Sequence, residues 1–162
     1  MTLVTEAVVR AALDSVNDPE IPVLSLDDLG ILRDVEVLDG RVIVTITPTY
    51  SGCPAMDEIR ADIKTVLAEL GVESEVRTTL SPAWTTDWMT EAGRSKLLAY
   101  GIAPPQPRGS GPVDLVLAPS PLSCPQCSSR DVEELSRFGS TSCKSMWRCN
   151  TCREPFDHFR AH

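Results

Sequence analysis

Two Cys-x-x-Cys pairs near the end of the sequence restrict the fold of this chain more than any other feature. The first pair is Cys124 and Cys127, the second is Cys149 and Cys152, and 21 residues lie between them. Each pair can present two thiolates to one metal ion, and two pairs complete the tetrahedral ligand set of Zn²⁺. The intervening residues are enough for a hairpin, so the sequence predicts a four-cysteine zinc ribbon over residues 123–162.

The four ligands alone leave the role of the predicted metal open. A segment of about 40 residues seldom folds without a metal or disulfides, so we interpret the zinc as structural. Because iron of the rubredoxin type uses the same four thiolates, an electron carrier is the alternative. Zinc ribbons often bind nucleic acid, but residues 123–162 hold six basic and five acidic residues without a basic face. We expect no nucleic-acid partner.

Charge and hydropathy exclude further classes. The net charge is −8, and residues 1–122 hold 9 basic against 18 acidic residues. No apolar run approaches the roughly 20 residues that span a bilayer, and Glu6 and Arg10 interrupt the apolar pattern at the start. We therefore expect a cytoplasmic protein without a membrane partner. A reducing compartment favours metal binding or reactive thiols over disulfides for the six cysteines.

Residues 1–105 carry the alternating signals of an α+β domain. Apolar residues recur at helical spacing in three stretches, the first with Thr2 as N-cap. Two β-rich runs flank Asp39-Gly40, which is a strong hairpin signal. The expected elements are helices over residues 3–16, 54–70 and 90–100, and strands over residues 31–38, 41–47 and 72–80. Their α-β-β-α-β-α order predicts a small sheet with packed helices.

A proline-rich linker is expected over residues 106–122, between this domain and the ribbon. Residues 103–122 contain 6 of the 13 prolines, a composition typical of an extended spacer. Within it, Val113–Leu117 alternates like a strand that could pair with a sheet edge.

Cys53 lies apart from the other cysteines, between a predicted strand and a predicted helix, directly before Pro54. The dipole and the unpaired N–H groups at a helix N-terminus lower the pKa of a thiol, so we expect a thiolate here. Thr49 and its neighbours supply hydroxyls around that sulfur. A small buried residue that fills a strand–helix corner is the equally open alternative. A thiol enzyme is not favoured, because both histidines lie at the far end of the chain.

Two further features leave alternatives open. Cys143 is the odd thiol inside the predicted ribbon, where Lys144 would favour its thiolate, unless it is a turn residue without a role. Trp84 and Trp88 are four residues apart and would share one face of a helix. That face is either part of the core or a docking surface for another protein.

The chain resembles a known family over nearly its whole length. The segments DPEIP (18–22) and DLGIL (28–32), the hairpin and a Thr-x-x-x-Cys-Pro element (49–54) resemble the SufT-type domain of iron–sulfur assembly factors. Residues 80–105 and the cysteine-rich end resemble one branch, the D subunits of the bacterial phenylacetyl-CoA epoxidase system. The order of these motifs makes the resemblance specific.

The resemblance implies a non-catalytic maturation factor in aerobic phenylacetate degradation. Cys53, alone or with Cys143 or a second Cys53 in a homodimer, would hold iron or a transient iron–sulfur cluster for the reductase or oxygenase subunits. The positions that match the motif and would shape the site are Asp18, Glu20, Asp28 and Thr49. The sequence has no Glu-x-x-His pair of a di-iron oxygenase. A structural adaptor that docks through the ribbon and the tryptophan surface is the alternative.

Overall fold

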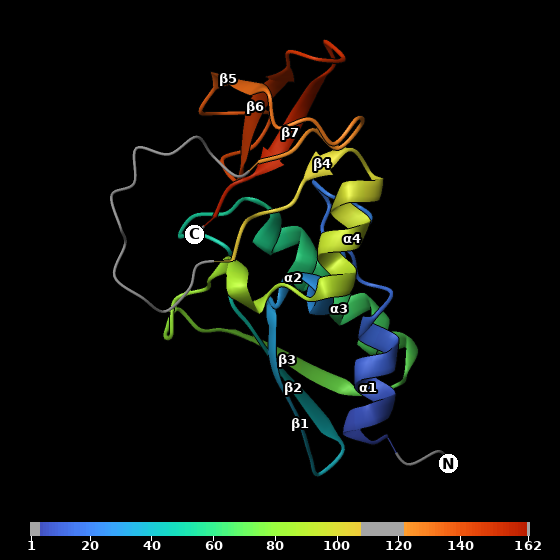
Figure 1. The fold of residues 1–162 in the computed structure, drawn as a ribbon. Helices are drawn as coiled ribbons and strands as arrows, with labels where there is room; N and C mark the ends of the chain where they lie inside the picture. The colour runs from blue at the N-terminus through green and yellow to red at the C-terminus, as the bar shows by residue number, and fades with distance from the viewer. Residues whose placement is uncertain (1–3, 108–121, 162) are drawn as a thin grey trace. The chain divides into compact units, whose positions relative to one another are not determined.

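The computed structural model describes residues 4–107 and 122–161. The chain divides into two compact units, Met1–Gly93 and Arg94–His162 (Figure 1). The predicted fold class, a mixed α+β domain followed by a β-rich cysteine module, is confirmed. No helix in the described ranges is long and apolar enough to cross a membrane.

A three-stranded sheet forms the centre of the first unit. Its order is β1 (Leu32–Leu38), β2 (Arg41–Ile46) and β3 (Glu73–Thr78). Strands β1 and β2 pair antiparallel, and Asp39 and Gly40 between them have φ angles of 49° and 81°. Positive φ at both positions is what a two-residue turn of this type requires, so the predicted hairpin is confirmed. Strand β3 pairs parallel to β2, and the two strands therefore end at the same edge of the sheet.

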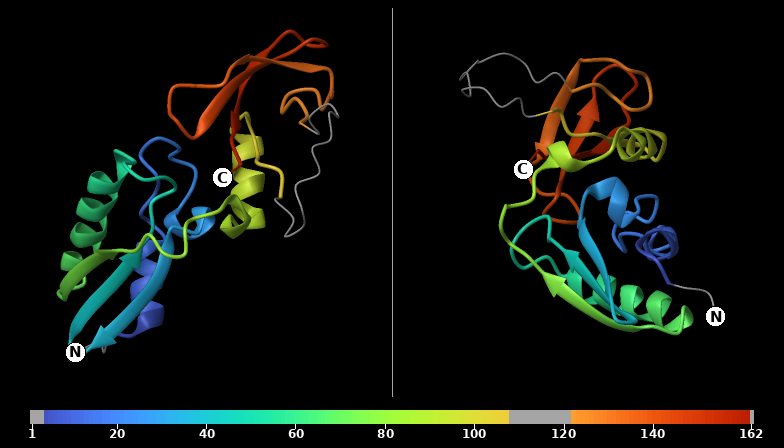
Figure 2. Two further views of the ribbon diagram at one scale, coloured as in Figure 1. Left: turned by 90° about the vertical axis from the view of Figure 1, so that its left-hand side faces the viewer. Right: turned by 90° about the horizontal axis from the view of Figure 1, so that it is seen from below.

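Helices cover one face of this sheet (Figure 2). Helix α3 (Ala55–Glu69) connects β2 to β3 and contacts β3, while α1 (Glu6–Leu13) contacts both β1 and α3. The predicted first helix is too long, because Thr5 caps α1 by accepting a hydrogen bond from the Val8 N–H. The expected cap Thr2 lies outside the described residues. The face toward the helices is apolar, and its fully buried strand residues are Val42, Val44 and Ile46.

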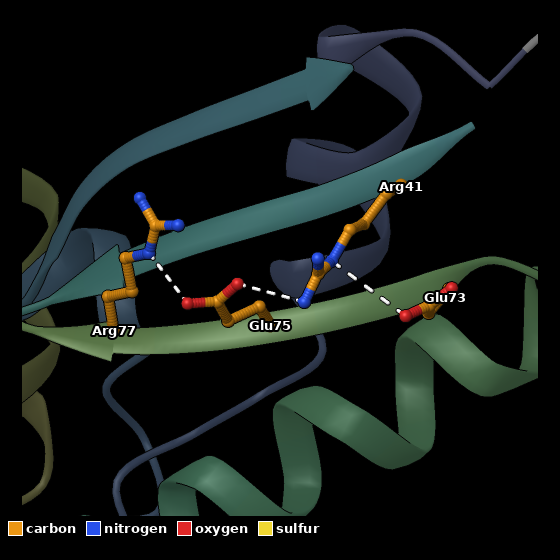
Figure 3. A network of polar contacts seen from close by, with 4 residues as sticks. All are labelled: Arg41, Glu73, Glu75 and Arg77. Atoms are coloured by element: carbon orange, nitrogen blue, oxygen red, sulfur yellow. Dashed lines mark hydrogen bonds and ion pairs between the residues drawn. The ribbon is translucent and has the colours of Figure 1, made fainter. Parts of the chain in front are cut away.

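The opposite face of the sheet carries a charged ladder (Figure 3). Arg41 contacts Glu75 at 2.9 Å and Glu73 at 3.9 Å, and Arg77 contacts Glu75 at 2.7 Å. The neighbouring Arg77 lowers the pKa of the Glu75 carboxyl. Exposed pairs of this kind stabilise a fold by at most about 1 kcal/mol, so the ladder serves chiefly to keep this face polar.

A short helix, α2 (Leu26–Leu29), was not predicted from the sequence. Ser25 and Asp28 form a capping box: the Ser25 Oγ accepts from the Asp28 N–H, and the Asp28 carboxylate accepts from the Ser25 N–H. The Ser-x-x-Asp spacing is a recognisable signal of a helix start. Gly30 ends α2 with φ of 69°, and a Cβ there would approach the Trp88 carbonyl oxygen to 2.6 Å.

The second unit contains a four-stranded sheet. Its order is β4 (Ile102–Ala103), β7 (Pro155–Phe159), β6 (Lys144–Cys149) and β5 (Val132–Ser136), in which only the β4–β7 pair is parallel. Helix α4 (Glu91–Ala99) runs from the first unit into the second.

The domain limits expected from the sequence, 1–105, 106–122 and 123–162, stay a prediction. The chain divides after Gly93, because β4 pairs with β7 and Ala103 packs in the core of the second unit. The strand expected over Val113–Leu117 lies outside the described residues. Within those residues, the edge beside β7 is occupied by β4.

Candidate metal centre and the Cys53 site

The four paired cysteines converge in the second unit. Their sulfur atoms all lie within 4.8 Å of one another. The Cys124 and Cys152 sulfurs are 3.7 Å apart, and those of Cys127 and Cys149 are 3.5 Å apart. A tetrahedral Zn²⁺ with Zn–S bonds of about 2.3 Å requires sulfurs roughly 3.8 Å apart. The two printed distances are close to this value, and the four sulfurs are grouped tightly enough to suit one shared metal ion.

The two cysteine pairs have the same backbone conformation. In each, the N–H four residues after the first cysteine donates to that cysteine's carbonyl: Ser128 to Cys124 at 2.9 Å and Arg153 to Cys149 at 3.0 Å. Ser128 and Arg153 have φ angles of 62° and 67°, the left-handed conformation that this turn needs. The two halves of the site are therefore related turns that present their sulfurs to a shared centre.

Backbone N–H groups support the sulfurs as thiolates. Gln126 donates to the Cys124 sulfur at 3.4 Å, and Cys152 donates to the Cys149 sulfur at 3.5 Å. The Cys152 N–H lowers the pKa of the Cys149 thiol to about 6. Although the Glu154 N–H lowers the pKa of Cys152, burial and the neighbouring thiols raise it to about 12. Four crowded thiols resist full ionisation unless a cation neutralises them, as a bound Zn²⁺ would.

Cys53 lies at the edge of the first unit where the parallel strands β2 and β3 end. It directly precedes Pro54, the N-cap of α3. A turn over residues 50–53 fixes the position of Cys53. In this turn the Cys53 N–H donates to the Tyr50 carbonyl at 3.3 Å, and Gly52 has φ of 86°. The crevice at the carboxyl ends of parallel strands is where α/β folds commonly bind ligands.

Two hollows flank this turn, which we call the Cys53 hollow and the Trp84 hollow. The Cys53 hollow is about 280 Å³ and the Trp84 hollow about 230 Å³. Pro48, Ser51 and Leu80 line both. The further residues around the Cys53 hollow are Gly52, Cys53, Met56, Asp57, Arg60 and Thr78. Those around the Trp84 hollow are Thr47, Thr49, Tyr50, Ala83 and Trp84.

The expected low pKa of Cys53 is wrong. Burial raises the pKa of the thiol, and the Asp18 and Glu20 carboxylates raise it further. Hydrogen bonds from the Ala55 N–H and the Tyr50 side chain lower it, but less than burial raises it. The helix N-terminus thus lowers the pKa of the thiol as predicted. Burial raises that pKa by more, because the half-buried sulfur has lost part of its hydration.

The motif residues have different local roles. The Asp18 carboxylate accepts the Glu20 and Ile21 N–H groups at 2.8 and 2.9 Å and fixes the loop that carries both acids near Cys53. Asp28 is 6% exposed and, besides its place in the capping box, accepts from the Thr90 hydroxyl at 3.1 Å. Thr49 lines the Trp84 hollow. Among the described residues, no group of three or more metal-ligating side chains includes Cys53.

Cys143 belongs to the second unit and is 7% exposed. Its sulfur lies 3.0 Å from the Thr141 hydroxyl. The influence of Lys144 on this thiol stays a prediction; the Lys144 side chain is itself buried, and its ammonium lies 3.9 Å from the Asp157 carboxylate. A joint role of Cys143 with Cys53 stays a prediction.

Of the two alternatives for the tryptophans, the core is confirmed for Trp84 and the docking surface is wrong for it. This side chain is 7% exposed, and its Nε1 donates to the Leu29 carbonyl at 2.8 Å. Only Trp88 lies in a short 3-10 helix (Thr86–Trp88), so the two rings do not share a helix face. Trp88 stacks under the Arg33 guanidinium, 3.7 Å from the ring centre. Trp84 is therefore a packing residue that also walls a hollow.

Among the residues that line the Cys53 hollow and were not predicted as site residues are Arg60, Thr78 and Leu80. Arg60 could have been found, because Met56, Asp57 and Arg60 follow Cys53 at intervals of three, four and seven residues, the spacing of one helix face. Thr78 and Leu80 could not, because they reach the site only through the parallel pairing of β3 with β2.

Comparison with known proteins shows which class of protein the two domains belong to. The family model described as iron–sulfur cluster assembly protein matches residues 6–78, and the one described as PaaD zinc beta ribbon domain matches residues 109–160. A domain of unknown function from Bacillus anthracis superposes with a TM-score of 0.54 at 30% identity, covering 57% of this chain and 90% of that one. The fold and the cysteines thus define an iron–sulfur assembly domain joined to a zinc ribbon.

Two relatives narrow the class to a family. A protein of Escherichia coli (strain K12), provisionally named as the D subunit of 1,2-phenylacetyl-CoA epoxidase, is 43% identical over 93% of this chain and 89% of its own length. The iron–sulfur protein maturation auxiliary factor SufT of Staphylococcus aureus (strain USA300) is 38% identical over 53% of this chain and 97% of its own. The chain belongs to the family of the phenylacetyl-CoA epoxidase D subunits.

Proposed function

We propose that this protein is a non-catalytic maturation factor of the phenylacetyl-CoA epoxidase system. Through Cys53 it holds iron or an iron–sulfur cluster and delivers it to the reductase or oxygenase subunits, while the four paired cysteines hold structural zinc. The observation that carries the proposal is the position of Cys53, beside a hollow of about 280 Å³ at the strand ends of the assembly domain.

The electrostatics of Cys53 favour a metal ligand over a nucleophile. Burial and the carboxylates of Asp18 and Glu20 raise the pKa of the thiol, so at neutral pH the thiol of the free protein keeps its proton. The same carboxylates that disfavour a bare thiolate stabilise a cation beside it. A thiol of this kind ionises when a metal arrives and recovers its proton when the metal leaves, which suits a carrier.

The test is an anaerobic assay of zinc, iron and acid-labile sulfide per chain, before and after reconstitution. We expect one zinc in both wild type and Cys53→Ser, with iron or iron plus sulfide taken up only by wild type. Cys143→Ser removes a thiol that lies outside the four-cysteine site and tests its predicted joint role: uptake equal to wild type would assign the iron to Cys53 without Cys143. Equal iron uptake by wild type and Cys53→Ser would contradict the carrier function. Iron in place of zinc in the four-cysteine site would indicate the electron carrier.

A structural adaptor is the second candidate, and one observation favours it. The β5–β6 hairpin of the ribbon exposes three large apolar side chains, Leu135, Phe138 and Met146, of which Phe138 is 68% exposed. Exposed apolar residues of this kind suit a protein interface. Binding to the epoxidase subunits that survives Cys53→Ser and is lost in Phe138→Ser would favour the adaptor.

A further inference from the structure

The Cys53 site is incomplete within the part of the chain that the structure describes. Cys53 is the only cysteine in residues 1–93. No group of three or more ligating side chains among the described residues includes it. Iron–sulfur clusters are held by four protein ligands, usually cysteine thiolates. If Cys53 carries iron, as proposed above, a molecule that bears further thiolates must approach it.

The surroundings of Cys53 are built for an incoming chain. The two hollows lie on either side of the same turn and share Pro48, Ser51 and Leu80. Leu80 is 65% exposed although it borders both. An apolar side chain left in water between two hollows gains free energy when a partner covers it.

The wall of the Trp84 hollow includes a residue whose buried polar group lacks a partner among the described residues. Thr47 is 1% exposed, lines this hollow, and its hydroxyl has no hydrogen-bond partner among the described residues. A buried hydroxyl without a partner is costly, so such groups are normally satisfied. A polypeptide carbonyl or amide placed in the hollow would satisfy it.

We infer that the two hollows form one groove, and that this groove seats an extended, cysteine-containing segment of the protein that receives the iron, which we call the client. This inference rests on the proposed carrier function. Delivery is then a ligand exchange: the bond from iron to the Cys53 sulfur breaks as the bond from iron to the client sulfur forms. The client thiol gives up its proton, Cys53 takes one up, and no electron is transferred.

Synthetic peptides that span the cysteine segments of the epoxidase reductase, blocked at both ends, provide the probe. Their affinity for the full, zinc-loaded chain is measured by calorimetry. Leu80→Ser should weaken binding roughly tenfold, as expected for an apolar anchor of this size. Leu38→Ser is the matched control, because Leu38 is 55% exposed and lines neither hollow; it should bind as wild type does.

Thr47→Val tests the polar contact with nearly unchanged shape. Since it removes an unsatisfied buried hydroxyl, the melting temperature should stay or rise while peptide affinity falls about threefold to tenfold. Protection of Cys53 from iodoacetamide by the peptide, followed by mass spectrometry, reports on the position of the bound segment.

The outcomes separate the groove from the carrier function. Equal peptide affinity in wild type and Leu80→Ser would overturn the groove, whatever iron uptake shows. Peptide binding that depends on Leu80 in a protein that takes up no iron would support the groove and refute the carrier function. Dimers of the wild type that Leu80→Ser dissociates, without peptide binding, would assign the groove to a second copy and overturn the inference.

Discussion

The two thiol sites of this protein differ in how completely the chain itself encloses a metal. The four-cysteine site has all its sulfurs within 4.8 Å of one another, two matched turns and N–H groups directed at sulfur. Cys53 is a single, half-buried thiol beside a hollow, with two carboxylates acting on it. A closed ligand set retains its metal, whereas a single ligand can release it. The proposed retention of zinc and the proposed exchange of iron therefore use the same kind of side chain in different surroundings.

Opening the closed site should have the strongest consequence. Cys149→Ser removes a sulfur that is fully buried in the core of the second unit. Structural zinc contributes about 10–16 kcal/mol to the folding of small zinc domains, so we expect loss of zinc and unfolding of the ribbon strands. Zinc content and hydrogen exchange over residues 122–161 measure this. Cys53→Ser serves as control and should keep one zinc; a Cys149→Ser protein with full zinc would refute the assignment.

The second effect is an acid sensitivity of folding that we expect in the second unit. His158 on β7 accepts from or donates to the Ser145 hydroxyl at 3.3 Å, and Ser145 in turn accepts from Trp147 Nε1 at 3.0 Å. Burial, with a smaller effect of the nearby Arg160 charge, lowers the pKa of His158 to about 4. Its lowered pKa means that the unfolded chain binds the proton more tightly. This part of the stability is complete above pH 6.5 and is lost as the pH falls toward 4.

The size of this loss is about 3 kcal/mol, from the difference between the folded and unfolded pKa of His158. His158→Gln should therefore flatten the acid side of the stability profile between pH 6.5 and about 4. Thermal unfolding at fixed zinc concentration measures it, and metal release at low pH is followed in the same samples. An identical slope in wild type and variant would show that zinc loss alone causes the acid sensitivity.

A third, smaller effect tests whether a motif residue belongs to the site or to the fold. Asp28→Ala removes the capping-box acceptor and leaves the Ser25 N–H and the Thr90 hydroxyl without it. We expect the free energy of unfolding of the first unit to fall by about 1–3 kcal/mol, with iron uptake per folded chain unchanged. Denaturant titration and the iron assay measure both. Lost uptake in a stable protein would instead give Asp28 a direct role at Cys53.

Asp28 also illustrates what sequence can and cannot predict. The four paired cysteines, the Asp39-Gly40 hairpin and the long helix after Cys53 follow from local spacing, and the structure confirms them. The capping box was overlooked although its spacing is local. The balance of effects on Cys53 could not be predicted, since burial arises only in the folded chain and the carboxylates that raise its pKa further, Asp18 and Glu20, lie far away in sequence. The position of Trp84 likewise depends on a contact with Leu29.

The weakest of these effects tests the electrostatics of the open site directly. Glu20→Gln removes one of the two carboxylates that raise the pKa of Cys53, while the Glu20 N–H can keep its bond to Asp18. The pKa of Cys53 should fall, so alkylation by iodoacetamide should rise with pH from a lower midpoint. Mass spectrometry of the Cys53 peptide measures the rate across pH. Glu73→Gln, on the charged face of the sheet, is the control and should leave the midpoint in place.

Because the carboxylate that disfavours the free thiolate also attracts a cation, Glu20→Gln should bind Fe²⁺ more weakly than wild type does. A lower midpoint with unchanged Fe²⁺ affinity would mean that the metal is held by the sulfur alone, and that the acids only keep the empty thiol protonated.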